Sequence, residues 1–265
     1  RWRNIRDNPF AGPILLGFQL ECLIENTLRR FRIEQAEPAL IEDEGLRFSN
    51  YEFKFVNAIE AGQSISTSIK PSQFKPGDRP TLSNRVSLLA DGKLAVAGFK
   101  RESATALTLP DIDLVALGDL NRAADRSFLA DTGIFLKRKY MTTSNAKNFL
   151  ASALVEQSDY IDELADRVHF PEIFPCSLMS CALLERASLQ GHDFEQEPMV
   201  YKSHKISIDR DLLEQMRSND ALHLLSRHTD PLEKTPVYDC FGILGSAKLL
   251  FSARIELMPL TNEVS

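Results

Sequence analysis

The chain has 265 residues, of which 43% are hydrophobic and 26% are charged, and its formal net charge is −6. This size and composition are typical of a globular protein with one large domain or two domains of roughly 130 residues. No apolar run approaches the roughly 20 residues that a membrane span needs, and we recognise no signal peptide. The negative net charge argues against a nucleic-acid partner. We therefore expect a cytoplasmic protein without a membrane span.

The four cysteines do not form any Cys-x-x-Cys pair, and three of them lie in apolar surroundings. We interpret them as reduced core residues. The five histidines have no metal-ligand spacing relative to the cysteines, so we expect neither a metal nor another cofactor. His192, His204, His223 and His228 lie in predicted strands or loops without recognisable partners, and we expect them at the surface.

A lead-in rich in proline and glycine, residues 8–17, runs into an apolar helix predicted over residues 14–31. The residues that recur at helical spacing are Leu16, Leu20, Leu23, Ile24, Thr27, Leu28 and Phe31. The free backbone N–H groups at the start of such a helix form a site for a carbonyl oxygen or an anion. An ordinary core helix is the alternative interpretation.

After an acidic connection at 34–44, alternating residues predict strands at 48–56 and 64–69, followed by a loop at 73–80. The clearest local pattern predicts a β-hairpin of residues 83–89 and 94–100, because Asp91 and Gly92 between them tolerate the positive φ of a tight turn. The first half is therefore one buried helix followed by about four antiparallel strands.

Residues 103–139 differ in character, with scattered leucines and a predicted short helix near 117–130. We interpret them as the connection between two halves, with an insertion inside a single domain as the alternative. The second half has a predicted helix that begins after Thr142, Thr143 or Ser144, then a helix at 177–187 that is apolar nearly all round. Further strands are predicted at 199–208, 222–228, 237–243 and 248–258.

The two halves repeat one pattern: a proline-bearing lead-in, a buried helix and several strands. Sliding Gly17 onto Cys176 (176 minus 17 gives an offset of 159 positions) also places Cys22 on Cys181. Two such sheets could close their open edges by pairing edge to edge. We expect a first unit at 1–105, a linker at 106–139 and a second unit at 140–265.

The lead-in Asn-Pro-Phe-Ala-Gly-Pro-Ile-Leu-Leu-Gly-Phe at 8–18 resembles the segment of MaoC-like enoyl-thioester hydratases and dehydratases that precedes the central helix of the hotdog fold. Residues 140–184 resemble the second copy in the same family. His169-Phe170-Pro171 resembles the run in which acyl-carrier-protein dehydratases place a catalytic histidine. The resemblance implies an α+β double hotdog, with two antiparallel sheets that are each wrapped around a central helix.

The catalytic motif of that family is altered in this chain. The family has an Asp, one residue, Asn-Pro, an apolar residue, then His and a further Asp, and this motif precedes the lead-in. In the first half it would fall before Arg1. In the second half, the register set by Asp162 puts Tyr160 at the histidine position, Gln157 at the asparagine position and Val155 at the catalytic aspartate position.

The resemblance implies an acyl-thioester protein of fatty-acid or polyketide metabolism that acts on an acyl-CoA or acyl-carrier-protein thioester. As an enzyme it would be an enoyl-thioester hydratase, a 3-hydroxyacyl-thioester dehydratase or a hotdog thioesterase. The altered motifs leave a second class open, namely a non-catalytic acyl-binding protein or the structural partner of an active subunit. For either class, a homodimer or a partner hotdog subunit is an expected partner.

Proton transfer in such a reaction needs an acid and a base, and the candidates are His169, Tyr160 and Asp162. A structural role is the alternative for His169. We expect the backbone N–H groups near Leu16 and Gly17 to point at the thioester carbonyl. Cys22 and Cys181 fall near the acidic helix position of the carrier-protein dehydratases. The expected substrate-binding residues are Leu16, Gly17, Cys22, Cys176 and Cys181.

Overall fold

The computed structural model describes residues 5, 8–10, 12–165, 167–229, 235–245 and 247–260. The helices are α1 Gly17–Glu34, α2 Glu37–Asp43, α3 Leu114–Leu117, α4 Thr143–Ser152, α5 Phe174–Ser177, α6 Met179–Leu189 and α7 Arg210–Glu214, with 3₁₀ turns η2 Gln157–Asp159 and η3 Glu163–Ala165. The strands are β1 Phe48–Phe55, β2 Ile65–Ile69, β3 Gln73–Lys75, β4 Thr81–Ala90, β5 Lys93–Ser103, β6 Ser127–Phe128, β7 Phe135–Tyr140, β8 Ile161–Asp162, β9 Arg167–Val168, β10 Met199–Asp209, β11 Ala221–His228, β12 Val237–Leu244 and β13 Lys248–Pro259.

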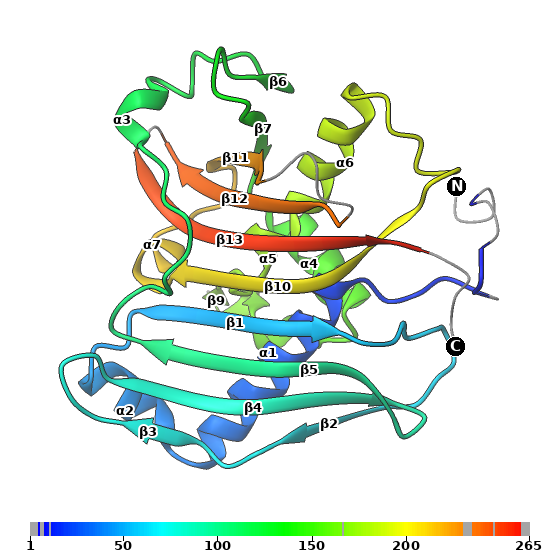
Figure 1. Cartoon of the computed structure of the whole chain (residues 1–265). Coiled ribbons are helices and arrows are strands. Elements are labelled where there is room, and N and C mark those ends of the chain that lie inside the picture. The colour runs from blue at the N-terminus through cyan, green and yellow to red at the C-terminus, as the bar shows by residue number, and fades with distance from the viewer. Residues whose placement is uncertain are drawn as a thin grey trace.

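One antiparallel sheet contains every strand except the small β8–β9 pair (Figure 1). Its order is β2-β4-β5-β1-β10-β13-β12-β11-β7-β6, with β3 attached to β4. The strands of the first half therefore occupy one side and those of the second half the other. The two sides meet where β1 pairs with β10, from Phe48 opposite Asp209 to Lys54 opposite Ser203. This confirms the expected continuous antiparallel sheet.

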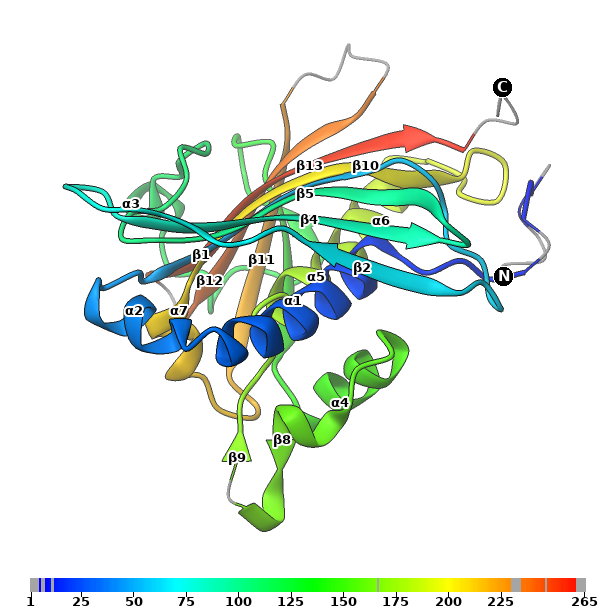
Figure 2. The ribbon, with the colours of Figure 1, turned by 90° about the horizontal axis from the view of Figure 1, so that it is seen from below.

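Helix α1 lies along one face of the sheet, and α4 with the β8–β9 segment lies on the side of α1 away from the sheet (Figure 2). Because it is covered from two sides, its buried residues extend beyond the predicted apolar stripe. Glu21, Glu25 and Arg32 are buried, whereas Leu16 is 50% exposed. The predicted apolar face therefore included only some of the residues that α1 buries. The predicted range, 14–31, is close to the observed Gly17–Glu34.

The second central helix, predicted over 177–187, corresponds to α5 and α6, which meet at Leu178. The prediction that this segment is buried all round was wrong. Leu184 and Leu189 on α6 are 50% and 60% exposed, since the sheet covers only one side of α6. Thr142 is the N-cap of α4 and accepts a hydrogen bond from the Asn145 N–H, as one of the expected caps.

Three connections also differ from expectation. The segment 34–44 contains α2, and 73–80 contains β3. The helix predicted near 117–130 is instead the short α3, which begins earlier because the Asp113 side chain accepts the N–H groups of Val115 and Ala116. It ends at Gly118, whose φ is +68°. The hairpin of β4 and β5 turns at Asp91 and Gly92 as predicted, with φ of 48° and 80°.

The connection from β5 to β7 packs on the second half of the sheet. Ile112 and Leu120 join a small apolar cluster with Leu225, Phe241 and Ile243 of β11 and β12. Strand β7 pairs with β11, so the sheet resumes within the last residues assigned to the linker. The division into units 1–105 and 140–265 stays a prediction.

Limited proteolysis tests that division. We expect early cleavage inside 103–139 and two fragments that remain associated, because the β1–β10 pairing holds them together without a peptide bond. Size-exclusion chromatography and mass spectrometry after brief digestion measure both properties. Cleavage confined to 140–260, or fragments that separate at once, would contradict two units joined by a surface linker.

Gly98 tests the packing within the first half of the sheet. A Cβ atom at this position would lie 2.0 Å from the Glu52 carbonyl oxygen and 2.8 Å from the Phe53 Cα. We therefore expect Gly98→Ala to lower the free energy of unfolding by about 1–3 kcal/mol or more. The matched control is Gly12→Ala, because a Cβ there meets no atom within 4 Å. Urea unfolding measures both, and equal stability of the two variants would refute this account of β5.

Candidate functional site

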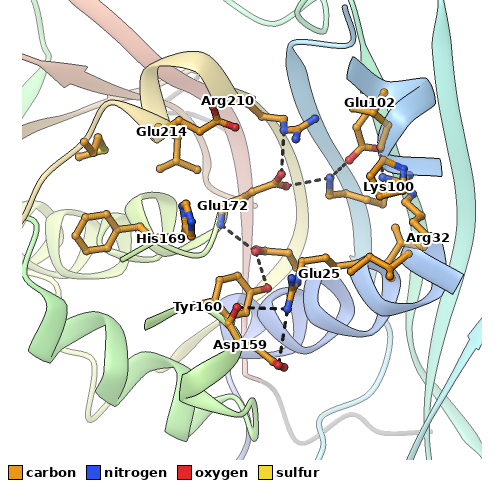
Figure 3. A pocket seen from close by; sticks show the side chains of 18 of the residues that line it. Glu25, Arg32, Lys100, Glu102, Asp159, Tyr160, His169, Glu172, Arg210 and Glu214 are labelled. Atoms are coloured by element: carbon orange, nitrogen blue, oxygen red, sulfur yellow. Dashed lines mark hydrogen bonds and ion pairs between the residues drawn. The ribbon is translucent and has the colours of Figure 1, made fainter. Parts of the chain in front are cut away.

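A cavity of about 460 Å³ lies between α1, β5, α7 and the segment that runs from η2 to α5 (Figure 3). Most of its polar lining is charged, and both halves of the chain contribute to it. The polar residues that Figure 3 labels in this lining are Glu25, Arg32, Lys100, Glu102, Asp159, Tyr160, His169, Glu172, Arg210 and Glu214.

Glu25 projects from α1 into the wall of this cavity and is only 5% exposed. Its Oε1 accepts hydrogen bonds from the Tyr160 hydroxyl at 2.9 Å and the Glu172 backbone N–H at 3.0 Å. Its Oε2 accepts from the Ile173 N–H at 3.0 Å and the Tyr51 hydroxyl at 3.2 Å. Three donors from the second half, together with Tyr51 of the first half, therefore fix this carboxyl group.

The pKa of Glu25 is raised to about 7. Burial is the main cause, because loss of water disfavours the ionised carboxylate, and the negative charge of Glu172 adds to it. The backbone N–H groups of Ile173 and Glu172 and the charge of Lys100 lower the pKa but do not cancel the rise. A carboxyl group in this state can give and take a proton near neutral pH.

The pKa of Glu172, in contrast to that of Glu25, is lowered. Glu172 accepts a hydrogen bond from the Ser49 hydroxyl, and its Oε2 lies 3.1 Å from Lys100 Nζ. The same Oε2 is 3.0 Å from the Tyr51 hydroxyl oxygen, whose one proton is shared between Glu172 and Glu25. Its Oε1 lies 3.4 Å from Arg210 Nε. Burial by itself would raise the pKa of Glu172, but the two cations and these hydrogen bonds lower it to about 2. Two neighbouring carboxyl groups with pKa values pushed apart are typical of acid–base sites.

Tyr160 and His169, two of the three candidate catalytic residues, both line the cavity, and their catalytic role stays a prediction. Burial, and next the charge of Glu25, hold the pKa of the Tyr160 hydroxyl well above its usual value, so this group remains a hydrogen-bond donor. The Arg29 guanidinium lies 5.2 Å from the centre of the Tyr160 ring. The His169 backbone N–H donates to the Tyr160 carbonyl oxygen at 2.9 Å.

Asp162 does not line the cavity. Its Oδ1 accepts hydrogen bonds from the backbone N–H groups of Leu164 and Ala165, which begin η3. The structure thus brings Tyr160 and His169 to one site and leaves the third candidate outside it.

The five expected substrate-binding residues also lie outside this cavity. The Leu16 N–H donates to the Gln19 Oε1 at 2.7 Å, and the close approach at Gly17 is made by the ring of Phe55, 2.8 Å from where a Cβ would stand. Cys22 and Cys176 are buried core thiols, and Cys181 is half-buried. Burial raises the pKa of both buried thiols. The binding role of these five residues stays a prediction.

Two histidines expected at the surface are buried. His204 lies on β10 in the middle of the sheet, where α1 covers it, and its Nδ1 is 3.0 Å from Glu21 Oε2. Both side chains are 0% exposed. His223 on β11 is also 0% exposed, and the Arg138 Nε donates to its Nε2 at 3.2 Å. The surface prediction was wrong for both because their strands are interior.

Sequence reasoning missed Glu25, Glu172, Lys100 and Arg210. One available signal was the spacing of Glu21, Glu25, Leu28 and Arg32, which places charged residues on a single face of a helix predicted to be buried. No comparable signal existed for Glu172, Lys100 and Arg210, because only the fold brings these distant positions together.

The described residues contain no group of three or more His, Cys, Asp or Glu side chains that could hold a metal ion. In the same part of the chain, none of the helices combines the length and apolar character that crossing a membrane requires.

Comparison with known proteins rests on structure, since neither a protein family model nor a curated protein sequence matches the chain. A conserved hypothetical protein from Mycobacterium tuberculosis, which is essential for bacterial survival during infection and has a double hotdog fold, matches with 10% identity and a TM-score of 0.51, over 95% of this chain and 83% of its own. A MaoC-like dehydratase matches with 8% identity and a TM-score of 0.52, over 94% of this chain and 85% of its own. An acyl-CoA thioesterase II from Mycobacterium marinum matches with 10% identity and a TM-score of 0.43, over 83% of this chain and 82% of its own. The chain has the double hotdog fold.

Proposed function

We propose that the chain is an acyl-thioester enzyme of the hydratase or dehydratase type, with a coenzyme A or carrier-protein thioester as substrate and Glu25 as the proton-transfer group. The observation that carries this proposal is a buried carboxyl group that lines a cavity between the two halves and accepts a hydrogen bond from Tyr160 at 2.9 Å. Burial raises the pKa of this group to about 7, which suits proton transfer. Its partner Tyr160 occupies the position that the resemblance assigns to the catalytic histidine. The same fold in a MaoC-like dehydratase supports the proposal.

Hydration of an enoyl thioester adds a hydroxyl group at the β-carbon and a proton at the α-carbon. Ionised Glu25 takes a proton from the attacking water and delivers it to the α-carbon, and the reverse sequence eliminates water. The Tyr160 hydroxyl, 2.9 Å from Oε1, stabilises the ionised form and orients the carboxyl group. Burial, and next the charge of the ionised Glu172, raise the pKa of Glu25 into the working range.

A second function, acyl-thioester binding without turnover, is favoured by one observation. Glu25 already accepts four hydrogen bonds from the protein, which is typical of a buried carboxylate that only joins structural elements. The wild-type protein would then bind an acyl thioester without hydrating it.

Glu25→Gln tests the enzyme proposal. Hydration of crotonyl-CoA, followed by the loss of absorbance of the conjugated double bond, should fall by about 10²–10⁴-fold in kcat, because the amide cannot exchange a proton. Asp162→Asn is the matched control and should keep activity, since Asp162 lies outside the cavity. Full activity in Glu25→Gln would refute the assignment, and binding without turnover by wild type would select the second function.

Tyr160→Phe refines the same test through the pH profile. Loss of the hydroxyl donor removes a hydrogen bond to the ionised carboxylate, so the pKa of Glu25 should rise. We expect the limb of the kcat profile that reports the ionised base to move to higher pH, with lower activity at neutral pH. An unshifted limb would mean that another group is the base.

The raised pKa of Glu25 also predicts a pH dependence of stability. Relative to its usual value of 4.5, a folded-state pKa of about 7 gives stability that is fully present below about pH 4.5 and lost as the pH rises to about 7. Between these limits the wild type should lose on the order of 3 kcal/mol relative to Glu25→Gln. Urea unfolding of both proteins from pH 5 to pH 8 measures the difference. A difference independent of pH would mean that the carboxyl group titrates normally.

A further inference from the structure

A second cavity, of about 320 Å³, lies between the start of α1, helix α6 and strands β10, β12 and β13. Its apolar wall includes Leu16, Leu183, Leu184, Met199 and Leu257. Among the described residues that line it there is no Asp, Glu, Lys or Arg, and its ionisable side chains are those of His192, His228, Tyr201 and Tyr238. Its volume falls in the range of about 300–1,000 Å³ that is usual for small-molecule sites.

The internal repeat relates this cavity to the first one. At the offset of 159 positions, Glu25 corresponds to Leu184 and Leu28 to Ala187. All four residues line their respective cavities. The two cavities therefore lie against corresponding helix positions of the two halves, and the second has leucine where the first has its acid.

The second cavity also has a polar pair in its wall. The Ser180 Oγ on α6 and the Tyr201 hydroxyl on β10 are 2.7 Å apart and share a hydrogen bond. The Tyr201 ring packs edge to face against the buried His204 ring, and the two ring centres are 4.5 Å apart. Two hydroxyl groups in an apolar wall suit an uncharged polar group on a ligand, whereas an unpaired carboxylate would be costly to bury there.

We propose that this cavity binds a medium-length aliphatic chain with a neutral hydrogen-bonding end, separately from the Glu25 site. The apolar side chains cover the hydrocarbon, and the Ser180–Tyr201 pair takes the polar end. Leu184 stands where the first cavity has Glu25, so this cavity lacks the carboxyl group to which we assign proton transfer in the first. The proposal does not depend on the function of the first cavity.

Isothermal titration calorimetry with straight-chain alcohols tests the proposal. Affinity should rise about fourfold for each added methylene from hexan-1-ol to decan-1-ol, the gain expected for burying one such group. Decanoate should bind at least tenfold more weakly than decan-1-ol, because neither Lys nor Arg lines the cavity and burying a carboxylate against its apolar wall is costly. Absence of binding by decan-1-ol, or equal binding of decanoate, would overturn the proposal.

A matched pair of variants locates the binding. Leu184→Asp puts a charge into the cavity at a half-exposed position and should lower the affinity for decan-1-ol at least tenfold. Leu189→Asp changes a leucine of α6 that is 60% exposed and lies outside the cavity, and it should stay within twofold of wild type. Equal losses in both variants would contradict binding at this place.

Two further variants keep the test decisive. Ala187→Phe fills the cavity without a charge and should also abolish binding, so it replaces Leu184→Asp if that variant does not fold. Glu25→Gln should leave binding unchanged. Loss of binding in Glu25→Gln with retention in Ala187→Phe would place the alcohol in the first cavity and overturn the proposal.

Discussion

The carboxyl group of Glu25 connects the two halves of the molecule at one buried point. It belongs to the helix of the first half, yet two of its four donors are the backbone N–H groups of Glu172 and Ile173 at the start of α5 in the second half. These N–H groups have no partner inside a helix, so the carboxyl group acts as their cap from another part of the chain. The arrangement of α1, α5 and the cavity between them depends on this contact.

The same contact explains why the site is both polar and buried. Glu172 follows Pro171, and its side chain turns toward Lys100 and Arg210 while its N–H meets Glu25. Glu172 thus joins Lys100 of β5 and Arg210 of α7 to Glu25 of α1. Glu172 carries the negative charge because Lys100 and Arg210 lower its pKa. Glu25 keeps its proton more readily because burial raises its pKa and Lys100 lowers that pKa only slightly.

Sequence patterns predicted the architecture better than the site. Alternation of apolar residues and the Asp91–Gly92 turn placed the strands, since both are local properties of the chain. The repeat predicted the pairing of two sheets. The burial of His204 and the charged face of α1 depend on what covers them, which is a long-range property. Tyr160 and His169 were selected through their motif context and lie at the cavity, whereas Glu172, Lys100 and Arg210 have no shared local signal.

The pairing of β1 with β10 has a consequence for how the site assembles. In a pair of separate hotdog subunits, the interface would form only above a certain protein concentration. Here both edges belong to one polypeptide, so each is always present at the high effective concentration that the connecting chain imposes. A cavity lined by residues from both halves can therefore form at any dilution of the protein, and its two walls can diverge in sequence because no symmetry requires them to match.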